Sequence, residues 1–198
     1  MKIIIARHSE KLDAPSLSAL GKLRAQALAD QYLGKHASQS LFSEKEQPAA
    51  LMVMTLHTIE TMAPIATNWN MPMIAYWAEA GIDRAHMAAQ NVRNREAAED
   101  LLFSQQYVDK TVLMIWEHFH IASAALEAEF AGEKVTLRQL LNLDQIAGVP
   151  TTWPDDVYDY FWIINYKTGN LVPQSFALVR QVFTAPYTGL PAADWPNS

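Results

Sequence analysis

The chain has 198 residues, a formal net charge of −6 and no cysteine. Half of its residues are hydrophobic and 18% are charged, which predicts one globular domain over residues 1–198. The composition excludes disulfides, thiolate catalysis and Cys-ligated zinc, and an acidic chain without a long Lys or Arg run is an unfavourable partner for nucleic acid.

The first segment of the chain predicts a strand followed by a loop and a helix. Residues 3–6 form an uninterrupted apolar run, as expected of a strand buried on both faces. Charge arrives at Arg7, so the run is too short for the apolar region of a signal peptide. The spacing of residues 20–28 predicts a helix that Ser16 or Ser18 caps and Gly34 ends. No stretch approaches the length of a membrane span, and we expect a cytoplasmic protein without a membrane partner.

The alternation of strand and helix continues along the chain. Four segments carry it: strands at residues 50–54 and 73–77, and helices at residues 59–66 and 84–105. The second strand has an edge-like pattern, and the second helix is open to an interruption near Asn91 or Asn94.

Residues 111–116 are the clearest later strand, and they end in Glu117 and His118. Helical patterns follow at residues 121–130 and 137–146, and two β-rich runs at residues 160–166 and 176–183 suggest a hairpin. This order predicts an α/β fold of three layers, α/β/α, with a mainly parallel sheet and right-handed crossovers.

Two histidines and an arginine fall at strand ends that such a sheet brings together. Arg7 and His8 end the first strand and His118 follows the strand at 111–116, and ligands of open α/β sheets bind beyond these carboxyl ends. A guanidinium grips two phosphate oxygens, a neutral imidazole can attack phosphorus, and a protonated imidazole stabilises the transition state. No metal is required. Taken alone, each histidine would more often be a packed or surface residue than a catalytic one.

Several segments, in order, resemble one family. Residues 6–11, Ala-Arg-His-Ser-Glu-Lys, are similar to the Arg-His-Gly or Arg-His-Ala-Glu-Lys signature of the histidine phosphatase, or phosphoglycerate mutase-like, superfamily. Residues 17–25, 60–66 and 112–118 are further segments similar to this superfamily. Trp153-Pro154 and residues 159–162 resemble a small bacterial branch of it that has the Arg-His-Ala-Glu-Lys form.

This resemblance implies a phosphatase that works without a cofactor. His8 would be the nucleophile that forms a phosphohistidine, Arg7 a phosphate ligand, and His118 the second catalytic histidine. The reaction would be metal-independent hydrolysis of a phosphomonoester, on a phosphorylated small molecule or a phosphoprotein. The resemblance leaves the oligomeric state open.

Two positions depart from the family's pattern. His57 stands where the family usually carries its second phosphate arginine, and Phe119 replaces the usual glycine after the second histidine. Losing a charge-assisted contact costs about 1.5 to 3 kcal/mol. A protonated His57 can still donate to phosphate, and Lys11 and Arg84 are further cations to consider, although surface positions suit both. A catalytically weak or inactive relative that binds phosphorylated ligands or a protein partner is therefore the alternative function.

The general acid has two candidates, Glu79 and Glu117. Glu79 lies in about the region of the chain where the resembled family has its general acid, and Glu117 directly precedes His118. We favour Glu79 slightly. A carboxyl group in an apolar crevice can acquire a raised pKa, which suits proton donation. Glu117 with His118 and His120 also suggests a metal site, but this pattern is short and nonspecific, and we expect no metal.

Overall fold

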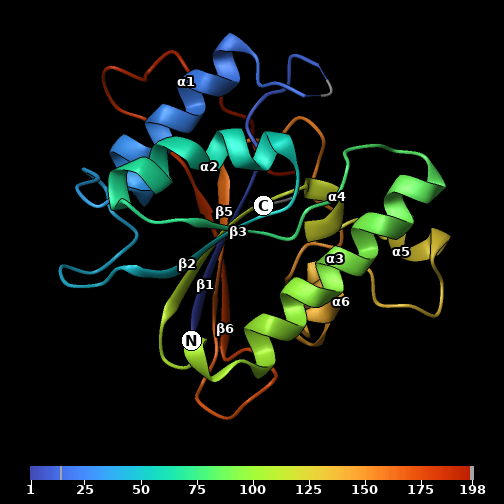
Figure 1. Ribbon diagram of the computed structural model, residues 1–198. Coiled ribbons are helices and arrows are strands. Elements are labelled where there is room, and N and C mark those ends of the chain that lie inside the picture. Colours follow the sequence, from blue (N-terminus) through green and yellow to red (C-terminus); the bar gives the residue numbers. More distant parts are fainter. Residues whose placement is uncertain (14, 197–198) are drawn as a thin grey trace.

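The computed structural model describes residues 1–13 and 15–196 and contains a six-stranded sheet in the order β3-β2-β4-β1-β5-β6 (Figure 1). The strands are β1 (Lys2–Arg7), β2 (Pro48–Val53), β3 (Met73–Ala75), β4 (Thr111–Trp116), β5 (Tyr160–Asn165) and β6 (Ser175–Arg180). Strands β1 to β4 pair in parallel, whereas β5 runs antiparallel to both β1 and β6. The predicted mainly parallel α/β sheet with an antiparallel hairpin is thus confirmed.

Helices cover both faces of the sheet. They are α1 (Ala19–Leu28) with the π-helical turn η1 (Ala29–Leu33), α2 (Leu56–Trp69), α3 (Arg84–Phe103), α4 (His118–Ile121), α5 (Ala124–Glu129) and α6 (Leu137–Leu140), with short 3₁₀ turns η2 (Gln105–Tyr107) and η3 (Leu143–Gln145). Figure 1 shows α1 and α2 on one side of the strands and α3 to α6 on the other. In the described ranges, no helix combines the length and the apolar character needed to cross a membrane.

Alternating side chains of the central strands bury both faces of the sheet. In β4, Leu113 and Ile115 pack with α1 and α2, whereas Val112, Met114 and Trp116 pack with α3 and α6. All five of these side chains are fully buried. Successive residues of a strand point to opposite faces, so an uninterrupted apolar run is what a two-sided core requires.

Helix α1 is fixed against the loop that follows β1. The Ser18 side chain accepts a hydrogen bond from the Gly21 backbone and caps the helix. A Cβ at Gly21 would lie 2.1 Å from the Glu10 carbonyl oxygen, so no other residue fits without moving the backbone. Arg24 of the same helix forms a bidentate ion pair with the Glu10 carboxylate, at 2.7 to 3.0 Å. Together these contacts hold the loop after His8 in place.

Three predicted helices differ from those observed. The helix predicted at residues 137–146 ends at Leu140, and after a turn in which Asn142 has a positive φ the chain continues as the 3₁₀ turn η3. Helix α3 runs without a break through Asn91 and Asn94, whose side chains point into the interior and bond other segments. The predicted helix at residues 121–130 instead starts at His118 and breaks after Ile121. The Ala122 carbonyl accepts from the Trp153 backbone N–H, and Ser123 caps the new helix α5. The break therefore results from a long-range contact that local spacing does not encode.

Candidate functional site

The adjacent parallel strands β1 and β4 bring the motif residues of two distant segments together. Arg7 pairs with Trp116 in the sheet register, and the His8 backbone N–H donates to the Trp116 carbonyl at 3.0 Å. His8 and His118 therefore leave the sheet side by side at its carboxyl edge, with ring centroids 5.6 Å apart. The first turn of α2 adds His57, whose ring centroid lies 5.8 Å from that of His8.

The His8 ring is held in one tautomer by its own loop. Its Nδ1 lies 2.7 Å from the Ser9 carbonyl oxygen, and because a carbonyl only accepts, Nδ1 carries the proton. The pKa of His8 lies well below its usual value, chiefly because the ring is buried. A neutral imidazole protonated on Nδ1 has a free lone pair on Nε2, and this buried atom has no hydrogen-bond partner.

Arg7 is buried behind His8 and is largely engaged by a loop of the chain. Its Nη2 lies 3.2 Å from the Nδ1 of His118, and its guanidinium lies over the Tyr158 ring at 3.9 Å. Its Nη1 donates to three carbonyl oxygens, those of Pro154 (3.0 Å), Asp155 (2.8 Å) and Val157 (3.2 Å). Burial lowers the pKa of Arg7 to about 10, which leaves it charged at neutral pH. Its Nε has no partner.

The Glu117 carboxylate lies at the centre of the cluster. Its Oε2 is 3.4 Å from the Nε2 of His8 and 3.1 Å from the ammonium of Lys11. Its Oε1 accepts from the Thr55 hydroxyl and lies 3.9 Å from the Nδ1 of His57. Burial alone would raise the pKa of Glu117, but the Lys11 ammonium and the hydrogen bond from the Thr55 hydroxyl lower it below its usual value. Glu117 is therefore an anion in the free protein.

His57 lies inside the cluster, at the position where the resembled family has an arginine. It is 1% exposed, and its Nε2 lies 2.7 Å from the Asp13 carbonyl oxygen, to which it donates. The opposite ring atom, Nδ1, is buried without a partner. Of the other cations considered, Lys11 reaches the cluster, whereas Arg84 is 69% exposed and pairs with Glu129.

Glu79 does not join the cluster. Its side chain is 82% exposed, and its recorded ionic partner is His86, at 3.9 Å. Of the two acid candidates, the structure thus brings only Glu117 to His8. Phe119 stacks on His118 with ring centroids 4.0 Å apart and packs with Met87 and Leu126, so the aromatic ring covers one face of the second histidine.

The ligand atoms of His8, Glu117 and His118 lie within 4.8 Å of one another, a spacing that suits a metal ion. The cations Arg7 and Lys11 contact this same group and oppose the binding of a divalent cation. We therefore assign no metal to the cluster.

His120 has a separate, structural environment. Its Nε2 contacts the Asn91 side-chain oxygen at 3.0 Å, and its backbone carbonyl accepts from Asn94 at 3.0 Å. Burial lowers the pKa of His120 to about 4. Fully buried and neutral, this histidine joins α4 to α3 and does not share a centre with Glu117 and His118.

Sequence reasoning missed three residues of the cluster: Thr55, Asp155 and Tyr158. Asp155 lies beside the Trp153-Pro154 pair that carried part of the family resemblance, and its Oδ1 is 3.0 Å from the Nε2 of His118. Thr55 is the residue that caps α2, a position readable from the sequence, but its contact with Glu117 joins segments 62 positions apart.

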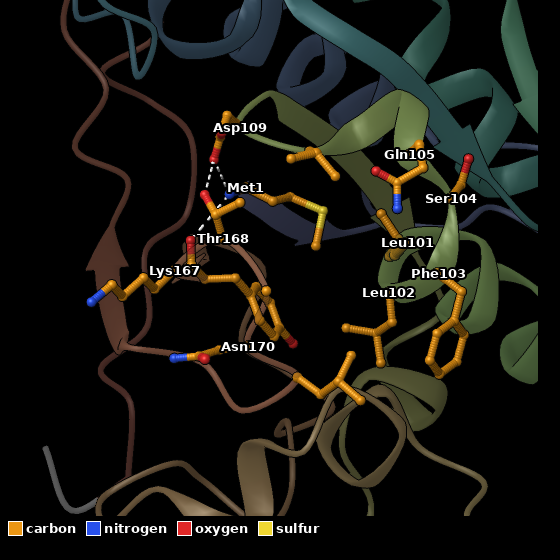
Figure 2. Close-up of a pocket in the computed structure, with 14 residues that line it drawn as sticks. Met1, Leu101, Leu102, Phe103, Ser104, Gln105, Asp109, Lys167, Thr168 and Asn170 are labelled. Carbon is orange, nitrogen blue, oxygen red and sulfur yellow. Dashed lines mark hydrogen bonds and ion pairs between the residues drawn. The ribbon is translucent and has the colours of Figure 1, made fainter.

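An open pocket lies at the opposite, amino edge of the sheet (Figure 2). It has a volume of about 360 Å³ and is lined by Met1, by the end of α3 and by residues 166–171 that follow β5. Two polar contacts lie within it: the Met1 amino group donates to the Tyr166 carbonyl oxygen at 3.1 Å, and the Thr168 hydroxyl donates to the Asp109 carboxylate.

Solved structures of phosphatases are similar to this chain. Mycobacterial glucosyl-3-phosphoglycerate phosphatase is 14% identical, with a TM-score of 0.46 over 92% of this chain and 99% of that one. The same enzyme complexed with VO3 is 15% identical, with a TM-score of 0.46 over 89% and 96%. A putative phosphohistidine phosphatase, SixA, from Agrobacterium tumefaciens is 16% identical, with a TM-score of 0.43 over 93% and 98%. No protein-family model and no curated protein sequence matches the chain. At sequence identities this low, the chemistry of the site has to be inferred from the residues of this chain.

Proposed function

We propose that the protein is a metal-independent phosphomonoester hydrolase that acts through a phosphohistidine on His8. One observation carries this proposal: three consecutive residues, together with a histidine beside His8, each have a buried polar atom without a hydrogen-bond partner. These atoms are the Nε of Arg7, the Nε2 of His8, the Oγ of Ser9 and the Nδ1 of His57. Buried polar atoms in native proteins almost always have partners. A phosphoryl group would accept from the Nε of Arg7, from the hydroxyl of Ser9 and from the Nδ1 of a protonated His57, and would offer an electrophile to the His8 lone pair.

The reaction follows from the tautomer of His8. Its Nε2 lone pair attacks phosphorus, the N–P bond forms, and the ester P–O bond breaks with its electron pair on the leaving oxygen. A water molecule then attacks phosphorus and gives a proton to the Glu117 carboxylate, which has by then donated its own to the leaving group. The N–P bond breaks, inorganic phosphate leaves and the lone pair returns to Nε2. Arg7 and a protonated His118 stabilise the charge on the equatorial oxygens.

Glu117 supplies the proton for the leaving group in this proposal. It is the acid candidate that lies within 3.4 Å of the nucleophilic nitrogen, whereas Glu79 is exposed beside His86. A bound phosphate dianion raises the pKa of a neighbouring carboxyl group. Glu117 is thus an anion before binding and takes up a proton when the substrate arrives, which it can then donate to the leaving oxygen.

A screen of phosphorylated small molecules and phosphopeptides, with and without a chelator, tests the proposal. We expect turnover that resists the chelator and a phosphoenzyme that is labile to acid and stable to base after rapid quenching. Turnover that stops with the chelator, or turnover without a phosphoenzyme, would contradict the mechanism.

The Glu117 carboxylate also favours a second candidate function. An anion 3.4 Å from the His8 Nε2 repels an incoming phosphate, and a site of this kind suits a weak or inactive relative that binds a phosphorylated ligand or a protein partner. Vanadate or phosphate binding without turnover and without a phosphoenzyme would favour this second function over hydrolysis.

A further inference from the structure

Both ring nitrogens of His118 have partners, and the partners define its tautomer. The Nδ1 lies 3.2 Å from the Nη2 of Arg7, and because a guanidinium only donates, Nδ1 accepts. The proton of the neutral ring therefore resides on Nε2, which donates to the Asp155 carboxylate at 3.0 Å. His118 thus presents Nδ1 to the cluster and Nε2 to a carboxylate.

The environment of His118 otherwise opposes its protonation. Burial, followed by the charge of Arg7, lowers the pKa of His118 to about 3. The charged or titratable groups that face the ring are Arg7, His8, Lys11, Glu117, His120 and Asp155. A hydrolase that needs an imidazolium at this position therefore needs anions next to the ring, and Asp155 is the one in direct hydrogen-bond contact.

Asp155 is exposed, but its backbone is fixed by the site itself. Its side chain is 82% exposed, against 7% for that of His118. The Arg7 guanidinium donates to the carbonyl oxygen of Asp155 and to those of two neighbours. The Trp153 indole closes the same loop by donating to the Val157 carbonyl at 2.7 Å. The phosphate-binding cation thus sets the position of the carboxylate that orients the second histidine.

We propose that Asp155 is a positioning residue, whose carboxylate holds the Nε2–H of His118, points Nδ1 at the phosphoryl group and stabilises the imidazolium during the reaction. This inference rests on the proposed hydrolase function and deepens it. A carboxylate that holds a catalytic imidazole in one tautomer has the same effect in other enzymes. The solvent around Asp155 screens the charge–charge part of the interaction.

The test compares Asp155→Asn with Asp156→Asn, which removes an exposed carboxylate from the next position of the loop. Long-range ¹H–¹⁵N spectra of the histidine rings report tautomer and charge without requiring turnover. We expect wild-type His118 protonated on Nε2. In the presence of vanadate, His118 of Asp155→Asn should lose its second proton at a pH about 0.5 lower than wild type, because an exposed pair contributes little. Asp156→Asn should titrate like wild type.

Kinetics supply a second measurement. The alkaline limb of the pH profile of kcat should move to lower pH in Asp155→Asn, because removing the carboxylate destabilises the imidazolium, and should stay in place in Asp156→Asn. Wild-type His118 protonated on Nδ1, or a His118 titration unchanged by Asp155→Asn, would overturn the inference. A shifted titration in a protein that turns over no phosphoester would support Asp155 as the partner of His118 while refuting hydrolysis.

Discussion

The two edges of the sheet differ in what they leave unpaired. At the amino edge, in an open pocket of about 360 Å³, the Met1 amino group donates to the Tyr166 carbonyl oxygen and the Thr168 hydroxyl donates to the Asp109 carboxylate (Figure 2). At the carboxyl edge His8 and His57 are each 1% exposed, yet each keeps a buried ring nitrogen without a partner. Unpaired buried atoms also occur elsewhere in the described residues, at Arg24, Asn91, His120, Trp162 and Gln181. The carboxyl edge differs because three consecutive residues, Arg7, His8 and Ser9, each have such an atom and His57 adds another beside His8. This concentration, and not the volume of a cavity, locates the candidate site.

The largest expected effect comes from removing the proposed nucleophile. His8→Ala should reduce phosphoester turnover by at least about a thousandfold and abolish the phosphoenzyme. His36→Ala, an exposed histidine, is the control and should behave like wild type. Steady-state rates and rapid quench measure both. Wild-type-like turnover in His8→Ala would contradict the mechanism, provided that the circular dichroism spectrum shows an intact fold.

Glu117→Gln should separate binding from catalysis. Removing a negative charge 3.4 Å from the proposed nucleophilic nitrogen of His8 should tighten vanadate binding by about tenfold or more, while turnover falls because the proposed general acid is lost. Glu79→Gln, at the exposed candidate, should change neither. Weaker vanadate binding in Glu117→Gln would show that the carboxylate does not face the bound anion.

The same carboxyl group predicts a proton linkage. Its pKa is lowered in the free protein and rises beside a bound dianion, so vanadate binding at neutral pH should take up protons. Calorimetry in buffers with different heats of ionisation measures the uptake, which Glu117→Gln should reduce. Equal proton uptake in the two proteins would assign the protonation to the histidines alone.

A lysine at each edge tests the comparison directly. Lys11 contacts Glu117 at 3.1 Å with its side chain 35% exposed, and Lys167 lines the pocket at the amino edge. Lys11→Ala should weaken vanadate binding by about threefold to fivefold, the value of a partly exposed ion pair, and Lys167→Ala should not. If Lys167→Ala weakened vanadate binding, the anion would bind at the amino edge of the sheet and not beside His8.

The sequence predicts the fold well where burial sets a local pattern. The apolar runs of β1, β2 and β4 are buried on both faces of the sheet. Uninterrupted runs of this kind predict the central strands of a parallel sheet. Patterns of this kind also place Arg7, His8 and His118 at strand ends. Local spacing fails where a distant segment decides the structure. The break after α4 depends on the contact between Ala122 and Trp153.

The candidate site was only partly predictable for the same reason. The site residues that directly follow strands could be predicted from the sequence, because the carboxyl ends of parallel strands lie at the same edge of a sheet. Asp155 could not be assigned a role, because its contact with His118 depends on how Arg7 holds a loop about 150 positions away. The choice between Glu79 and Glu117 likewise depends on burial. Glu79 follows β3 and is exposed to solvent, whereas Glu117 follows β4 and lies next to His8.

The smallest expected effect concerns His57, at the position where the resembled family usually has an arginine. His57→Arg should tighten phosphate or vanadate binding and make it less dependent on pH, because guanidinium stays charged throughout the usable range. A charged hydrogen bond contributes about 1.5 to 3 kcal/mol at most. The fully packed ring leaves little room, however, and a larger side chain in a packed site costs about 1 to 3 kcal/mol. The net gain should therefore be below about tenfold.

The pH dependence of this variant is more decisive than its affinity. The Nδ1 of His57 can donate to a phosphate oxygen only in the imidazolium form, whereas a guanidinium donates at every usable pH, so the affinity of His57→Arg should depend less on pH than that of the wild type. Anion titrations between mildly acidic and mildly alkaline pH, corrected for the ionisation of the ligand, measure the difference. His57→Gln is the control: it is neutral at every pH and should bind weakly throughout. Identical pH profiles for wild type and His57→Arg would mean that the unpaired Nδ1 of His57 does not face the phosphate.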